Sequence, residues 1–186
     1  MNWDDNAFII SKKKFRENAI ILDIFTCNHG KVSGIVYGGN SRKVKNYLQL
    51  LNKIFVIYNS KSENKIGYFK TELINPISPL YFDNKIKILC INSLSSLLKA
   101  VLPENQPYEK IYKSLCHLLE NFSDNNWLRS YLDWEINLIN NLGFGFKIDQ
   151  SKYKDLHLNK IINVKLDNIN YEIPSFLITD HPVKID

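Results

Sequence analysis

Cysteine, glycine and proline are all scarce in this 186-residue chain, and each shortage argues against a class of protein. The three cysteines, at positions 27, 90 and 116, are odd in number and lack Cys-x-x-Cys spacing. Neither a disulfide framework nor a structural zinc site is therefore indicated, and we interpret them as buried free thiols. Seven glycines and six prolines are too few for a collagen-like or low-complexity chain.

Long apolar runs and catalytic motifs are absent as well. No stretch of 18 apolar residues occurs, and the first residues are acidic where a secretory signal would be basic, so we expect a cytoplasmic protein without a membrane partner. The histidines at 29, 117, 157 and 181 form no HExxH pattern, and no GxSxG, P-loop or GxGxxG motif occurs. The sequence thus predicts no enzyme, no cofactor and no metal.

Positive charge is distributed unevenly along the chain. Residues 1–75 hold 12 Lys and Arg against 6 Asp and Glu, whereas residues 76–186 hold 12 against 13. The whole excess of the +5 net charge therefore belongs to the first segment. Such asymmetry favours a module that faces a polyanion joined to a neutral one, although a general bias towards Asn, Ile and Lys would also enrich a surface in lysine.

The first segment reads as β-structure. Short β-rich runs alternate with Gly, Asn and Ser, at Ala7–Ile10, Ala19–Phe25, Val32–Tyr37, Ile54–Tyr58 and Ile66–Leu73. Five short strands within about 75 residues match an OB-fold, a small Greek-key barrel. We therefore predict an α+β protein whose residues 1–77 form a five-stranded OB-fold domain.

Helical periodicity replaces the strand pattern after Pro76 and Pro79. Apolar residues recur at helical spacing up to Pro103, then from Pro107 to Phe122, and again from Ser123 until Gly143, where a C-cap glycine belongs. We predict an α-helical domain over residues 78–145. The remainder, 146–186, is expected to be a small irregular segment with a short hairpin that pairs Val164–Leu166 with Tyr171–Ile173.

Nucleic-acid binding requires cations along a groove and flat rings on which bases stack. The cationic candidates are Lys12, Lys13, Lys14 and Arg16 in the expected first connection, Lys31 at the start of the third strand, and Arg42, Lys43 and Lys45 in a glycine-started loop. The aromatic candidates are Tyr37, Tyr47 and Tyr68. Because a strand alternates its faces, only one of Tyr68 and Phe69 can point outward. We expect these cations to gather on one side of the barrel. An OB-fold that binds RNA, or an adaptor that binds proteins, remains an alternative.

Several segments resemble the RecO family of bacterial recombination mediators. The opening, from Ala7–Ile10 through Glu17–Thr26 to His29–Val32, is similar to the family's first strands and its Phe-Thr-x-x-His-Gly-Lys/Arg turn. Gly38-Gly39 with Arg42 resembles its glycine-plus-basic loop. In the helical part, Leu98–Glu104 and Glu135–Gly145 are similar to its Leu-Leu-Pro-Glu segment and its Glu-x-x-Leu-Leu-x-x-Leu-Gly-Tyr/Phe-Gly ending.

The resemblance implies an OB-fold packed on helices, without enzymatic turnover. It also implies binding of single- and double-stranded DNA, annealing of complementary strands, and loading of RecA, together with RecR, onto strands coated by the single-strand-binding protein SSB. The resemblance also implies that the protein is located in the cytoplasm and associates with the nucleoid. Lys31, Arg42, Lys43 and Lys45 are the DNA-contacting candidates by position.

Two departures from the family pattern affect these expectations. Many relatives carry a four-cysteine zinc site after the Leu-Gly-Tyr-Gly segment, but Gly145–Asp186 holds no cysteine, so we predict no zinc. Where some relatives have a basic pair, this chain has Leu132-Asp133, which leaves Arg129 as a weak candidate for SSB binding. The chain also stops soon after a segment that in relatives precedes further helices, so it is naturally short or truncated.

Overall fold

The computed structural model describes residues 2–61, 65–143, 162–166 and 169–173. The chain divides into two compact units, one extending to Glu109 and one beginning at Lys110. The first unit therefore contains α2 as well as the barrel, whereas the sequence places a boundary after residue 77. Every helix within the described ranges is too short or too polar to cross a membrane.

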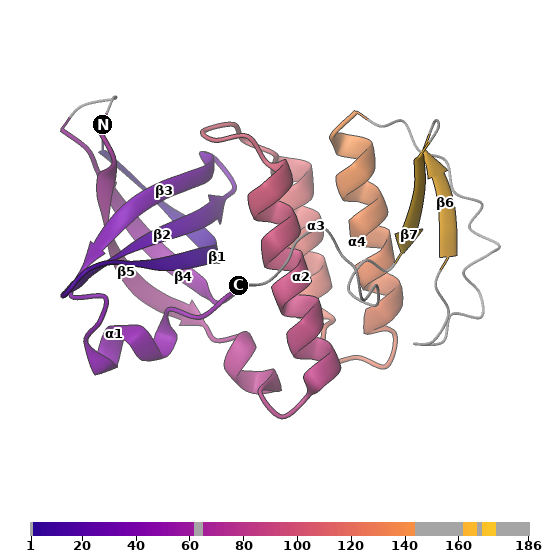
Figure 1. Ribbon diagram of the computed structural model, residues 1–186, viewed down its shortest axis with the longest axis horizontal. Helices are drawn as coiled ribbons and strands as arrows, with labels where there is room; N and C mark the ends of the chain where they lie inside the picture. Colours follow the sequence, from indigo (N-terminus) through magenta and orange to yellow (C-terminus); the bar gives the residue numbers. More distant parts are fainter. Residues whose placement is uncertain (1, 62–64, 144–161, 167–168, 174–186) are drawn as a thin grey trace. The chain divides into compact units, whose positions relative to one another are not determined.

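The first unit is built on a closed five-stranded barrel with the strand order β1-β2-β3-β5-β4, shown in indigo to violet in Figure 1. Its strands are β1 (Asn2–Arg16), β2 (Ala19–Thr26), β3 (Gly30–Tyr37), β4 (Lys53–Asn59) and β5 (Gly67–Asn75). β1 pairs with both β2 and β4, and a short parallel pairing of β3 with β5 closes the barrel. The predicted α+β class and OB-fold barrel are confirmed.

Alternation along the strands fills the barrel interior. The inward side chains are almost entirely aliphatic, which is the main favourable contribution to folding. They are Ala7, Ile9, Ile20, Leu22, Ile24, Val32, Val36, Leu48, Ile54, Val56 and Phe69. Phe69 is 3% exposed and Tyr68 is 37% exposed, so the sequence correctly predicted that these neighbours point to opposite faces.

The connection from β3 to β4 contains a helix where the sequence suggested a loop. This helix, α1 (Arg42–Tyr47), has Ser41 as its N-cap, whose hydroxyl accepts from the Val44 N–H. Six residues are too few to show a helical period, which explains why the pattern was not visible. Arg42, Lys43 and Lys45 are thus helical and exposed rather than loop residues.

The Asn52 side chain connects the segment before β4 to the segment after β5. It is fully buried, and its amide donates to the Tyr47 carbonyl at 2.8 Å. Its side-chain oxygen accepts from the N–H groups of Ile77 and Ser78, at 2.7 and 3.1 Å. One polar side chain therefore joins the end of α1 to η1 (Ser78–Tyr81), the 3₁₀ turn that leads into α2.

α2 (Lys85–Val101) belongs to the barrel unit and contacts β1. Near its end, the Lys99 ammonium donates to Ser11 Oγ at 2.8 Å and lies 3.5 Å from an Asp23 carboxylate oxygen. Asn84 is its N-cap, and the helix ends at Val101, with Leu102 as the C-cap directly before Pro103, as predicted.

The second unit contains α3 (Glu109–Glu120), α4 (Trp127–Asn141) and a two-stranded sheet of β6 (Ile162–Leu166) and β7 (Ile169–Ile173). The predicted apolar stripe of α3 is buried at Ile111, Leu115 and Leu118. Gly143 has φ +95° just after α4, which confirms the predicted C-cap. The predicted hairpin is also present, with Val164 opposite Tyr171.

Candidate nucleic-acid interface

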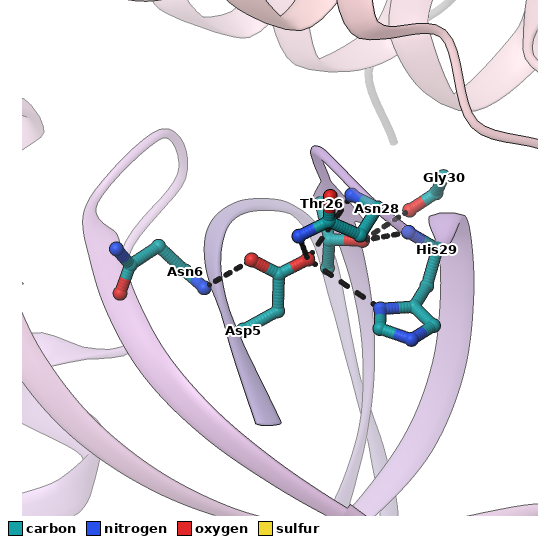
Figure 2. A network of polar contacts seen from close by, with 6 residues as sticks. All are labelled: Asp5, Asn6, Thr26, Asn28, His29 and Gly30. Carbon is teal, nitrogen blue, oxygen red and sulfur yellow. Dashed lines mark hydrogen bonds and ion pairs between the residues drawn. The ribbon is translucent and has the colours of Figure 1, made fainter. Parts of the chain in front are cut away.

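The turn between β2 and β3 explains one of the sequence motifs. Figure 2 shows how Asp5, on the neighbouring strand β1, holds this turn: one of its carboxylate oxygens accepts from the Asn28 backbone and side-chain N–H groups at 3.1 and 3.2 Å. The same oxygen lies 3.4 Å from His29 Nδ1, an ion pair when the imidazole is protonated. Thr26 Oγ1 accepts from the His29 N–H at 2.9 Å. The Phe-Thr-x-x-His-Gly motif therefore shapes a turn.

Lys31, which follows this turn, contacts α2 and the segment after it. Its ammonium donates to the Lys99 carbonyl of α2 at 2.9 Å, and its backbone bridges to Glu104. Tyr37, at the opposite end of the same strand, is six residues away, or about 20 Å at the usual rise per residue. Lys31 therefore lies at the end of β3 that faces away from Tyr37, and the expectation that it gathers with Arg42, Lys43 and Lys45 stays a prediction.

Lys12, Lys13, Lys14 and Arg16 also differ from expectation, because they lie on β1 rather than in a connection. A register shift between Ile9 and Ser11 changes which residues face inward. Lys12 is consequently opposite Leu22, and Lys14 is opposite Ile20, on the face that carries the core side chains. Lys13 pairs with Ile21 and takes the other face.

Lys12 reaches from β1 to the end of α1. Its ammonium donates to the Leu48 carbonyl at 2.8 Å and to Gln49 Oε1 at 2.9 Å. Burial, followed by the nearby charge of Lys45, lowers the pKa of Lys12 from its usual value. The repulsion between these two cations would be relieved by an anion bound beside them.

The β1–β2 turn is held against the turn that precedes α1. Asn40 Nδ2 donates to the carbonyls of Arg16 and Glu17 at 3.2 and 2.7 Å, and the Gly38 N–H donates to the Asn18 carbonyl at 2.7 Å. These bonds bring the end of β1, with Arg16, to the turn from which α1 starts. Two segments far apart in sequence thus place their cations at one end of the barrel.

The three predicted tyrosines line one groove at this end. The groove has a volume of about 250 Å³ and lies between β3, β5 and α1. Tyr37 is 65% exposed, and its ring centroid is 6.4 Å from that of Tyr68. Tyr47 is half-buried, and its hydroxyl donates to the Thr71 carbonyl at 2.8 Å. It therefore forms a fixed wall, whereas Tyr37 and Tyr68 remain available as stacking surfaces.

Lys70 is a functional candidate that the sequence reasoning missed. It is exposed and lines the groove together with the tyrosines. The signal was available, since Lys70 stands two residues after Tyr68 and strand alternation puts both on one face. The interface candidate therefore comprises Lys70 at the tyrosine groove, Arg42, Lys43 and Lys45 on α1, and Lys12 and Arg16, which contacts bring to the same end of the barrel. The roles of Lys13 and Lys14 stay predictions.

The remaining predicted candidate, Arg129, lies in the second unit on α4. Burial raises the pKa of Asp133 above its usual value, although the charges of Arg129 and His117 partly oppose this shift. Among the described residues no group of three His, Cys, Asp or Glu side chains is placed to hold a metal ion. The side chains of the cysteine-free C-terminal span lie outside the described residues, so the prediction of no zinc stays a prediction.

Comparisons with family profiles and with known proteins point to the same family. The family profile described as "Recombination protein O N terminal" matches residues 1–77, and "Recombination protein O C terminal" matches residues 84–151. DNA repair protein RecO of Wolbachia sp. subsp. Drosophila simulans (strain wRi) is 35% identical, over 82% of this chain and 62% of that protein.

Two Rickettsia proteins extend this comparison. DNA repair protein RecO of Rickettsia felis is 31% identical, over 97% of this chain and 81% of that protein. The Rickettsia canadensis protein of the same name is 34% identical, over 82% of this chain and 62% of that protein. The chain thus spans less than two thirds of the length of most of these relatives.

Proposed function

This chain belongs to the RecO family, and on that premise we propose that it binds single- and double-stranded DNA and anneals complementary strands during DNA repair. With RecR, it would help RecA to replace SSB on single strands. The length of the chain relative to its relatives makes these activities of the whole protein part of the proposal. No catalytic group is needed for any of them.

The single observation that carries the proposal is the convergence of cations at the α1 end of the barrel. Lys12 lies within Coulombic reach of Lys45, and hydrogen bonds hold the end of β1 against the turn before α1. α1 carries no acidic residue in its first turn. Such a surface neutralises backbone phosphates without reading base sequence.

Annealing follows from the same electrostatics. Two complementary strands repel one another through their phosphates, and a basic surface that binds both lowers this repulsion. Base pairing then supplies the free energy, so the protein acts by charge and geometry alone. Because released counterions drive such binding, affinity should fall steeply as salt concentration rises.

The test compares two double variants by fluorescence anisotropy with single-stranded and duplex oligonucleotides across a salt series. Lys43→Ala/Lys45→Ala removes two cations of the proposed surface, and we expect weaker binding to all sequences and a salt slope smaller by about one to two units. Lys85→Ala/Lys110→Ala is the matched control, because it removes two exposed lysines elsewhere. An unchanged slope in the first variant would show that the surface is wrongly chosen.

The annealing activity is tested separately with complementary oligonucleotides, naked or coated with SSB. We expect the wild-type protein to accelerate annealing and the Lys43→Ala/Lys45→Ala variant to do so much less. Tighter binding of matched RNA than of DNA, or of a protein partner with no salt dependence, would instead favour the alternative functions.

A further inference from the structure

We propose that the tyrosine groove receives one unpaired nucleobase, so that this end of the barrel prefers single strands over duplex. The inference rests on the proposed DNA-binding function, and it adds which form of DNA the site selects. The groove supplies a position for a base, whereas the surrounding cations supply only phosphate contacts.

The groove exists because β3 and β5 pair over a very short distance. Their parallel ladder consists of Gly34 opposite Gly67 and Ile35 opposite Tyr68. Beyond these residues the strands diverge, and the buried side chains of Val36 and Phe69 line the opening. A Cβ at Gly34 would collide with the Phe69 ring, so glycine there allows the ring to lie against β3.

The sides of the groove suit a flat ring with polar edges. Tyr37 and Tyr68 are inclined at 56° to one another, so they are not stacked together, and both retain exposed surface. Further polar groups come from the Tyr47 and Thr71 hydroxyls, whose oxygens lie 2.9 Å apart. Because the Tyr47 O–H already donates to the Thr71 carbonyl, its oxygen can only accept, whereas the Thr71 hydroxyl can donate or accept; together they match the mixed donors and acceptors on the edge of a base.

Cations flank the groove on both sides, as a bound strand requires. Lys70 is on the β5 side, while Arg42, Lys43 and Lys45 extend from the helix whose Val44 and Tyr47 line the groove. A strand that crosses here would place phosphates near both groups while one base points inward. The positive surroundings thus identify a nucleic-acid base, rather than a neutral aromatic compound, as the occupant.

Selection for single strands follows from the cost of exposing a base. A base in a duplex must first be unpaired and unstacked, at a cost of a few kcal/mol, before it can enter a pocket. A base in a single strand avoids most of that cost. Phosphate contacts are available in single strands and duplexes alike, so they do not involve this unpairing cost. Any preference for single strands should therefore depend on the tyrosines.

The experiment uses Tyr37→Leu and Tyr68→Leu, with Phe82→Leu as the matched control because Phe82 is an exposed ring outside the groove. Each tyrosine variant should lose roughly 5- to 150-fold in affinity for single strands, the usual range for one base–aromatic stack, with duplex affinity unchanged. An oligonucleotide carrying 2-aminopurine should show fluorescence quenching on binding to the wild type and to Phe82→Leu, and less quenching with either tyrosine variant.

Failure of this inference is distinguishable from failure of the proposed function. If the wild-type protein binds DNA but the tyrosine variants lose single-strand and duplex affinity equally, or 2-aminopurine quenching is unchanged, the base site is refuted and the basic surface stands. If the wild-type protein binds no oligonucleotide at low salt, the proposed function itself is refuted.

Discussion

Two glycines with nearly equal positive φ angles should respond very differently to alanine. Gly30 has φ +69° and Gly38 has φ +72°, so alanine is strained at both positions, by about 1–2 kcal/mol. A Cβ on Gly30 would also collide with the backbone carbonyl of Gln106, whereas a Cβ on Gly38 would meet no atom within 4 Å. The difference in unfolding free energy between the two alanine variants therefore measures the contact of Gly30 with the Gln106 backbone.

We expect Gly38→Ala to cost about 1–2 kcal/mol of unfolding free energy and Gly30→Ala about 1–3 kcal/mol more, because the collision is with backbone, which yields less easily than a side chain. The entropy that alanine removes from the unfolded chain is the same in both variants and cancels in the difference. Hydrogen exchange of the amides of β1, β2 and β3 is the suitable assay, since it reports the barrel separately from the second unit. Equal destabilisation within about 0.5 kcal/mol would refute the claim that the segment after α2 packs tightly on the start of β3.

Further predictions concern stability. Asn52→Ala leaves two buried backbone N–H groups without their acceptor, so we expect a loss of roughly 2–4 kcal/mol in urea unfolding; a loss below about 1 kcal/mol would contradict that role. Tyr47→Phe removes the bond to Thr71 and should cost about 0.5–1.5 kcal/mol, with the far-UV spectrum unchanged. Burial raises the pKa of Asp133, so its ionised form destabilises the native state, and stability gained on protonation is lost as pH rises through the folded pKa. Asp133→Asn should therefore raise the melting temperature at neutral pH and have little effect below pH 3.8, the usual carboxyl value; a decrease at neutral pH would reverse the sign.

The sequence by itself predicted most of the strands, the longer helices and much of their burial, although it missed the short helix α1 and the full length of β1. Alternation over Tyr68 and Phe69 predicted which ring is core, and helical spacing with Pro103 and Gly143 predicted where two helices end. These signals are local, because each depends on the period of a single element or on the backbone preference of one residue. The count of strand-like runs was sufficient to predict the barrel.

Only the tertiary structure decided which of the predicted cations lie near one another. A register shift in β1 directs Lys12 towards the end of α1, while Lys31 is drawn to α2 at the other end of β3, and neither outcome is visible in residue spacing. The groove likewise depends on where β3 and β5 pair and then separate. Convergence of this kind depends on barrel closure and strand register, which are set by contacts between residues distant in sequence.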